Sequence, residues 1–143
     1  MTRASELADA IEAQLNKIRT ADGFHHDIDR VYGFGQRKPD NVAPPFILIR
    51  ILEDRTDETA GNAANRVVDY EIEGVMSRSS ELRDLQLLHH DIMRSLGLGQ
   101  FTHIRPIKPG FPFEESTEFE PDRDGQPVRR LISTVTFRYV EKY

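Results

Sequence analysis

The stretch PPFILIRIL, residues 44–52, decides the fold of this chain. Its apolar residues are nearly continuous and rich in β-branched isoleucine, which is typical of a short strand covered on both faces. Pro44 and Pro45 suit the start of such a strand, because proline has no N–H to offer a neighbouring strand. The sequence therefore predicts a buried strand over residues 46–52.

A second strand is predicted over residues 66–77, after a charged connection over residues 53–65 that has no periodicity. Apolar and acidic side chains alternate along this strand, which places them on opposite faces of a sheet. The apolar face contains Val68, Tyr70, Ile72, Gly74 and Met76, and the other face contains Asp69, Glu71 and Glu73. One face of the strand is thus expected to contact water or a partner.

An amphipathic helix is predicted before these strands, over residues 5–19, where the apolar residues follow helical spacing. Ser5 is its expected N-cap, and Asp22-Gly23 its expected stop. The stripe is formed by Leu7, Ala8, Ile11, Leu15 and Ile18. A helix of this kind covers one face of a sheet.

A second helix is predicted after the strands, over residues 80–96. Ser79 or Ser80 is its expected N-cap, and Gly97 its expected C-terminal stop. Its apolar stripe is wider and contains Leu82, Leu85, Leu88, Ile92, Met93 and Leu96. The two stripes are expected to lie on the same face of the sheet.

Further strands are predicted over residues 24–32, 101–107 and 128–139, the last one alternating between apolar and polar side chains. Asp124-Gly125 lies between two extended stretches and favours a hairpin. Residues 113–120 are therefore expected to pair with the last strand. The rest of the segment between Lys108 and Pro127 is interpreted as a long acidic connection.

Together these elements predict an α+β fold in a single domain over residues 1–143. The sheet is expected to be mixed and mostly antiparallel, with two main helices packed on one face and with long loops or hairpin extensions. The chain has 143 residues, of which 38% are hydrophobic and 30% charged. Because this apolar share is low, neighbouring subunits are expected to complete part of the burial.

The overall charge and the terminal sequence exclude several classes of protein. A net charge of −5 with dispersed lysine and arginine is unlike a nucleic-acid-binding protein, which normally carries a basic face. The absence of cysteine excludes disulfides and thiolate metal sites. The first residues lack the apolar run of a signal peptide, and no apolar stretch approaches the ~20 residues of a membrane helix. We therefore expect a protein made in the cytoplasm, without a membrane partner.

The sequence His-His-Asp-Ile occurs twice, at residues 25–28 and 89–92, and suggests a metal site. Four imidazoles and two carboxylates could hold zinc or iron. However, adjacent residues of a helix point ~100° apart, so His89 and His90 cannot chelate one ion together. His90-Asp91 also resembles the doublet of metal-dependent phosphohydrolases, but those proteins need further helix-borne ligands that are not found here. We therefore predict solvated or interface histidines, and assign no metal ligand, catalytic residue or cofactor.

Two other segments invite a functional interpretation. The loop from Gly33 to Lys38 lacks the third glycine of the dinucleotide motif and the Gly-Lys-Ser/Thr ending of a phosphate loop. The acidic run from Glu114 to Asp124 lacks the spacing of a calcium loop. The first is interpreted as a turn, and the second as a solvated or partner-facing extension whose phenylalanines favour contact with a partner.

The order of elements, taken with two local sequences, resembles one family. The chain has a helix, a Pro-Pro before an apolar strand, a long helix ending in Leu96-Gly97-Leu98-Gly99, and a terminal strand ending in Tyr139-Val140-Glu141-Lys142-Tyr143. Over nearly its whole length it resembles the tail terminator, or tail completion, proteins of tailed bacteriophages. It is less closely similar to other small ring-forming neck and head–tail connector proteins.

The resemblance implies a structural assembly protein of the virion, and not an enzyme. Such a subunit forms a hexameric ring on the head-proximal end of the tail tube, ends tail polymerisation and provides the docking face for the head. Its implied partners are further copies of itself, the tail tube protein and the head–tail connector protein, with DNA passing through the lumen without specific binding. The alternatives are a connector or neck ring protein, a metal-dependent hydrolase that uses the His-His-Asp-Ile segments, and a small-molecule-binding domain.

Overall fold

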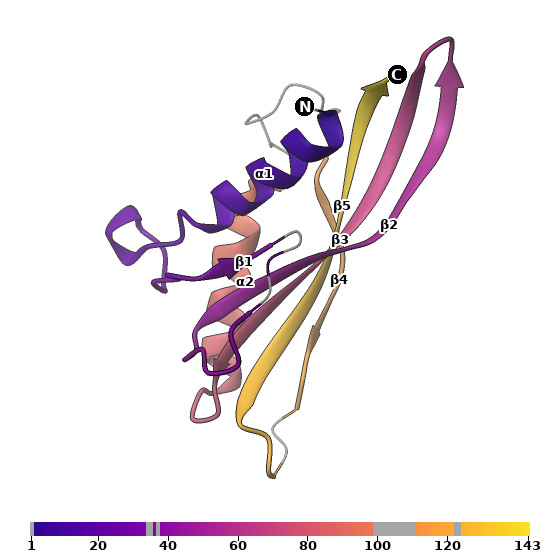
Figure 1. Cartoon of the computed structure of the whole chain (residues 1–143). Coiled ribbons are helices and arrows are strands. Elements are labelled where there is room, and N and C mark those ends of the chain that lie inside the picture. Colours follow the sequence, from indigo (N-terminus) through magenta and orange to yellow (C-terminus); the bar gives the residue numbers. More distant parts are fainter. Residues whose placement is uncertain (1, 34–35, 37, 99–110, 122–123) are drawn as a thin grey trace.

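The computed structural model describes residues 2–33, 36, 38–98, 111–121 and 124–143. Within these ranges the chain forms two α-helices, one 3-10 helix and a five-stranded sheet (Figure 1). The elements are α1 (Arg3–Leu15), η1 (Thr20–Asp22), β1 (Val31–Tyr32), β2 (Phe46–Ala60), β3 (Ala63–Ser77), α2 (Leu82–Leu96), β4 (Phe113–Phe119) and β5 (Val128–Lys142).

The sheet has the strand order β1-β2-β3-β5-β4. β1 runs parallel to β2, and the other neighbouring pairs are antiparallel. The pairing of residues 113–120 with the last strand is confirmed, because β4 pairs with β5 from Phe113↔Thr136 to Phe119↔Leu131. The predicted class, an α+β fold with a mixed and mostly antiparallel sheet, is therefore confirmed.

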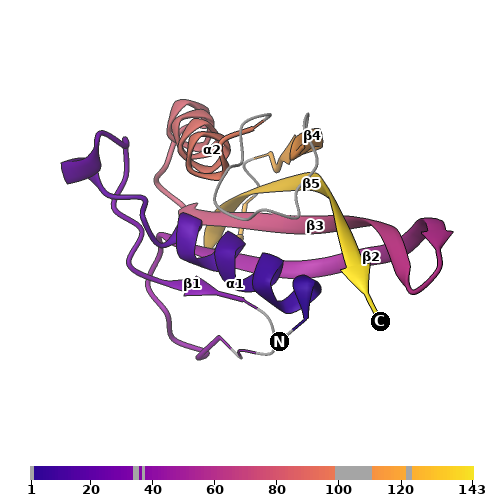
Figure 2. The ribbon, with the colours of Figure 1, turned by 90° about the horizontal axis from the view of Figure 1, so that it is seen from above.

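Both helices pack on one face of the sheet, as predicted, and share one hydrophobic core. In Figure 2 α2 is seen nearly end-on and α1 from the side, so the two helices run in different directions. The largest fully buried side chains include Tyr70 of β3, Phe137 and Tyr139 of β5, and leucines of both helices. The predicted inward residues of β3 form this face, and acidic Glu71 and Glu73 lie on the opposite face together with Arg50 and Arg130.

The predicted loop over residues 53–65 is wrong. β2 and β3 form a single hairpin that ends at Gly61, whose φ is 60°. Its outer part, which we call the β-arm (residues 52–66), extends beyond the two helices (Figure 1). The strand was missed because bulges between Ile51 and Glu53 and between Thr56 and Glu58 break the two-residue alternation. In addition, residues 55–60 of the arm are exposed, so this part of β2 needs no apolar face.

The predicted burial of both faces over residues 46–52 is correct only at the start of β2. Phe46, Ile47 and Ile49 are buried, but Ile51 is 46% exposed and Leu52 is 49% exposed. β2 passes beyond the helices at this point, so its apolar side chains lose their cover. Among the described residues, β1 pairs only with Ile47 and Leu48 along the outer edge of β2.

The helix boundaries differ from the predicted ones at their N-termini. α1 is capped by Thr2, and Ser5 is its partner in a capping box, with hydroxyl-to-amide distances of 3.1 Å in both directions. α2 is capped by Glu81 with Asp84, and not by Ser79 or Ser80. The stop at Gly97 is confirmed, because this residue has φ 60° and ψ 55°.

The weak strand predicted over residues 24–32 is reduced to β1. Residues 24–28 instead form a loop against α2, and their polar groups are used in side-chain contacts described below. The α1 helix also ends earlier than predicted, at Leu15, although Ile18 remains fully buried. The strand predicted over residues 101–107 lies outside the described residues.

Gly74 in β3 is expected to tolerate no side chain. A Cβ at this position would lie 2.8 Å from Leu88 Cδ2 and 3.3 Å from Leu131 Cγ, and both leucines are fully buried. Overpacking of this kind costs ~1–3 kcal/mol. We expect Gly74→Ala to lower the free energy of unfolding by about that amount in a denaturant titration, and an unchanged midpoint would show that α2 can move away from the sheet.

Candidate functional site

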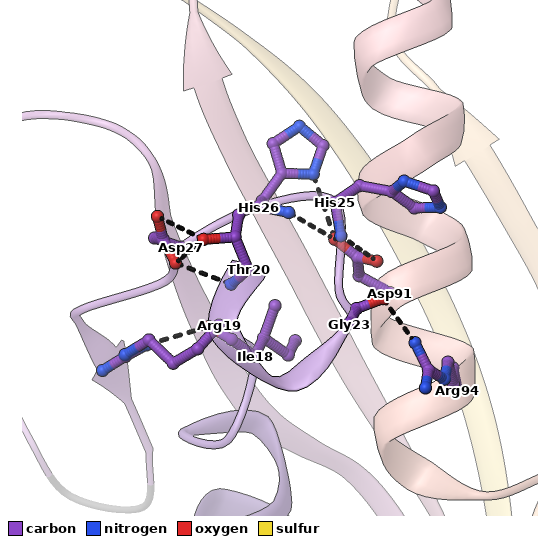
Figure 3. Close-up of polar contacts among 9 residues, drawn as sticks. All are labelled: Ile18, Arg19, Thr20, Gly23, His25, His26, Asp27, Asp91 and Arg94. Carbon is purple, nitrogen blue, oxygen red and sulfur yellow. Dashed lines mark hydrogen bonds and ion pairs between the residues drawn. The ribbon is translucent and has the colours of Figure 1, made fainter.

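The structure brings the two His-His-Asp-Ile segments together. Asp91 lies in α2 with a fully buried side chain, and it accepts hydrogen bonds from the loop that carries the first segment (Figure 3). The backbone N–H of His25 donates to both carboxylate oxygens at 3.0 Å, and that of His26 donates to Oδ2 at 2.9 Å. His26 Nδ1 lies 3.1 Å from the same oxygen. We call His25, His26, His90 and Asp91 the histidine–aspartate cluster.

The loop before the cluster is fixed by a second residue of α2. Arg94 follows Asp91 by three positions, so both side chains lie on the same side of the helix. Arg94 Nη1 donates to the carbonyl oxygen of Gly23 at 2.6 Å, and its guanidinium lies 4.8 Å from the ring centre of Phe24. Gly23 has a φ of 87°, which favours glycine at this turn.

The aspartate of the first segment has a different and local role. Asp27 Oδ1 accepts the backbone N–H of Thr20 at 2.7 Å and the Thr20 hydroxyl at 3.0 Å (Figure 3). The hydrogen bond from the Thr20 backbone lowers the pKa of Asp27, and the bond from the Thr20 hydroxyl adds to this effect. Both aspartates of the repeated sequence therefore bind backbone N–H groups, one within the loop and one between the loop and α2.

The imidazoles divide between two surroundings. His25 and His90 are exposed, and their ring centres lie 5.4 Å apart with the planes tilted by 57°. His89 points elsewhere, with Nε2 2.8 Å from Glu114 Oε1 on β4. The prediction that adjacent His89 and His90 do not share an ion agrees with these directions. The approach of His25 to His90 was missed, and the repeated motif was the one signal in the sequence.

Asp91 is expected to hold the loop of residues 23–28 on α2. Asp91→Ala leaves the N–H groups of His25 and His26 without their acceptor, at a cost of ~1–3 kcal/mol in the free energy of unfolding. The matched control is Asp27→Ala, which removes the exposed aspartate of the other segment and should cost less. Denaturant titrations compare the two variants, and amide exchange at residues 25 and 26 reports the release of the loop. Equal costs would contradict the assigned role of Asp91.

A second polar surface covers the sheet face opposite the helices. Its charged side chains form ion pairs between strands. Three of these pairs join neighbouring strands, namely Arg50–Glu71, Arg55–Asp69 at 2.9 Å and Arg130–Glu73 at 3.3 Å. The fourth, Arg138–Asp57 at 2.5 Å, joins β5 to β2 across β3. Between the first and third of these pairs lies an open hollow of about 390 Å³. We call this surface the charged sheet face. Because these four arginines are already paired with carboxylates, they add no uncompensated positive charge to the described part of this surface.

A buried tyrosine joins the β-arm to the end of β5. The hydroxyl of Tyr139 donates to Asp54 Oδ2 at 2.7 Å, and Arg66 Nε donates to Oδ1 of the same carboxylate at 2.8 Å. Burial raises the pKa of the Tyr139 hydroxyl, and its hydrogen bond to Asp54 adds to the rise. The arm is thus tied to the sheet by specific contacts at its base.

Glu73 of the charged sheet face is expected to destabilise the fold at neutral pH. Burial raises its pKa above the usual value, and Arg130 only partly opposes this effect. A carboxyl group with a raised folded-state pKa contributes most stability below its unfolded pKa of ~4.3 and loses that contribution as the pH rises through the folded pKa. Glu73→Gln should therefore raise the melting temperature at pH 7, with the gain disappearing towards pH 4.

The exposed Glu53 provides the control for this pH dependence, since its side chain is 63% exposed. Glu53→Gln should leave the melting temperature nearly unchanged across the same range. A lower melting temperature of Glu73→Gln at pH 7 would mean that the ion pair with Arg130 outweighs the cost of burial.

The remaining candidate segments do not form a further site among the described residues. In the turn from Gly33 to Lys38, the backbone N–H of Gln36 donates to the Gly33 carbonyl at 2.8 Å, and residues 34, 35 and 37 lie outside the described ranges. The acidic run begins in β4, at the edge of the sheet, where Glu115 and Glu118 are exposed as expected of a solvated extension, whereas contact with a partner stays a prediction. Phe119 packs against the core, whereas Phe113 is 43% exposed.

Comparison with known proteins adds no family. No protein-family model matches the chain, and no curated protein matches it. Neither α-helix of the described residues is long and apolar enough to cross a membrane.

Proposed function

We propose that the protein is a ring-forming tail terminator, which closes the head-proximal end of a phage tail tube. The proposal rests on the β-arm and on the edge of β2 that faces away from β3, which is unpaired among the described strands beyond Leu48. Ile51 and Leu52 are exposed there, next to backbone groups that no described strand pairs. An unpaired strand edge with exposed apolar side chains is a surface for another chain.

The two free edges of the sheet favour assembly as a closed ring rather than as a symmetric dimer. The outer half of β2, with which β1 does not pair, and the outer side of β4 lie on opposite edges of the described sheet. They also differ in chemistry, because the first carries Ile51 and Leu52, whereas the second carries Glu114, Glu115 and Glu118. A closed ring uses two different patches on each subunit, whereas a two-fold dimer uses one patch twice.

The charge distribution supports a lumen that DNA passes without being held. The chain has a net charge of −5, and the arginines of the charged sheet face are paired with carboxylates. Affinity for DNA depends on uncompensated cations that displace counterions from phosphates. A ring of such subunits is therefore expected to bind DNA weakly, with a small dependence on salt concentration.

The proposal gives the protein no catalytic role. Asp91, the buried carboxylate of the histidine–aspartate cluster, is engaged by backbone N–H groups of the loop. The hydrolase alternative requires this carboxylate to act on a substrate, and its contacts favour a positioning role. The implied partners are further copies of the chain, the tail tube protein and the head–tail connector protein.

Electron microscopy of the purified protein mixed with tail tubes of its parent phage tests the proposal. We expect hexameric rings at one end of each tube and no further growth when tube protein is added. Tube protein that continues to polymerise past the added protein would contradict the proposal. Rings that bind only isolated heads or connectors would instead support the neck-protein alternative.

A further inference from the structure

Two imidazoles and one carboxylate converge where the loop of residues 23–28 meets α2. One potential ligand atom from each of His25, His90 and Asp91 lies within 4.8 Å of the others. These residues come from two distant segments of the chain, with His25 in the loop after α1 and His90 and Asp91 next to each other in α2. We propose that His25, His90 and Asp91 bind a divalent transition-metal ion, with zinc as the ion that this set suits.

The ligand set points to a transition metal because two of its three donors are imidazole nitrogens. Zinc, copper, nickel and iron accept imidazole, whereas magnesium and calcium prefer oxygen ligands. In a tetrahedral zinc site with bonds of ~2.0–2.1 Å, neighbouring ligand atoms lie ~3.3–3.5 Å apart. The three atoms must therefore approach by ~1–1.5 Å, and the exposed rings of His25 and His90 can turn by that amount.

The carboxylate is held in place before any ion binds. Asp91 is fully buried, and Oδ2 accepts from the backbone of both loop histidines and lies 3.1 Å from His26 Nδ1. Oδ1 accepts a single hydrogen bond among the described residues, from the His25 backbone at 3.0 Å. One lone pair of Oδ1 thus remains for a metal ion. Hydrogen bonds of this kind orient metal-binding carboxylates.

The backbone contact also places the ring of His25. Because the N–H of His25 donates to Asp91, its side chain begins beside the carboxylate with which it would share the ion. His90 precedes Asp91 in α2, and its ring already lies against that of His25. Three protein ligands leave a fourth position open on the exposed side, which water can fill.

The proposed ion joins α2 to the loop that Asp91 and Arg94 already hold. Zinc binding is therefore expected to raise the melting temperature, because it favours the folded chain in which the three ligands are close together. This site is independent of ring formation, and its presence does not depend on the proposed terminator role.

The site is tested by isothermal titration calorimetry, in which zinc chloride is added to the full chain carrying no histidine tag. We expect one zinc ion per chain, and a loss of affinity of at least about tenfold in His25→Ala and in His90→Ala. The matched control is His89→Ala, which removes the neighbouring imidazole that contacts Glu114. This control should bind zinc like the unchanged protein.

Circular dichroism and thermal melting of each variant without metal separate ligand loss from unfolding. Both exposed histidines can be replaced without opening the core, so the variants should fold. The proposal is overturned if the unchanged chain binds no zinc, or if His25→Ala and His90→Ala bind zinc as tightly as the unchanged chain does. It is also overturned if His89→Ala loses as much zinc affinity as the other two variants.

Discussion

Ile92→Asp is expected to prevent folding. Ile92 is fully buried in the core shared by both helices and the sheet, and no lysine or arginine is among the buried side chains of the described residues. The substitution removes ~2–5 kcal/mol of apolar burial and adds the cost of an unpaired buried carboxylate, several kcal/mol more. This exceeds much of the ~5–15 kcal/mol that stabilises a domain of ordinary size. Circular dichroism should show the loss of the folded signal and of the cooperative thermal transition.

The control for this substitution lies in the same helix. Leu82 is the first residue of α2 and is 49% exposed, and an acidic residue is favourable in the first turn of a helix. Leu82→Asp should change the free energy of unfolding by no more than about 0.5 kcal/mol. A cooperative transition of Ile92→Asp close to that of the control would show that this side of α2 is not part of the core.

Replacement of Ile51 and Leu52 by serine is expected to abolish assembly while preserving the fold. Both side chains are nearly half exposed at the base of the β-arm, so their loss removes little burial within one subunit. The free energy of unfolding should change by less than about 1 kcal/mol, whereas rings on tube ends should be absent. Thermal melting and electron microscopy measure the two quantities on the same preparation.

The matched control for assembly is Leu82→Ser. Leu82 has the same exposed fraction as Leu52, but it lies at the start of α2, away from the β-arm. This variant should form rings normally. If it abolishes assembly and the double serine variant does not, the interface lies over α2 and the role assigned to the β-arm is wrong.

The parts of the fold that could be predicted are those whose pattern is set by one continuous core face. In β3, every second side chain meets the apolar layer, so the alternation of Val68, Tyr70 and Ile72 is visible in the sequence. In α2, every third or fourth side chain meets the same layer, so its apolar stripe is visible as well. Residues 55–60 of the β-arm are exposed and meet no such layer, and the two bulges of the arm shift the alternation. Its charged residues therefore look like a loop when they are read one after another.

The histidine–aspartate cluster could be predicted only in part. The repeated His-His-Asp-Ile sequence draws attention to the right residues, and helical geometry correctly separates His89 from His90. The meeting of His25 with His90 depends on how the loop packs against α2. That packing is set by Arg94, Gly23 and the buried Asp91, and none of their contacts has a local signature in the sequence.

The N-cap of α1 could also be predicted only in part from the sequence. The sequence predicts Ser5 as the N-cap of the first helix, whereas the cap is Thr2 and Ser5 is its partner. A capping box contains two suitable residues three positions apart, and the sequence alone does not rank them. The backbone amides of Arg3 and Ala4 bind Glu141 of β5, a contact that extends the helix to an earlier start.

If the protein is the proposed tail terminator, the distribution of tail lengths after deletion of its gene from the phage tests most directly whether it ends tail polymerisation. If the protein ends tail polymerisation, the deletion should give tails of uncontrolled length that do not join heads, and the unchanged gene supplied in trans should restore normal particles. Tails of normal length on complete particles would contradict the account, and tails of correct length without heads would assign the protein to the connector instead.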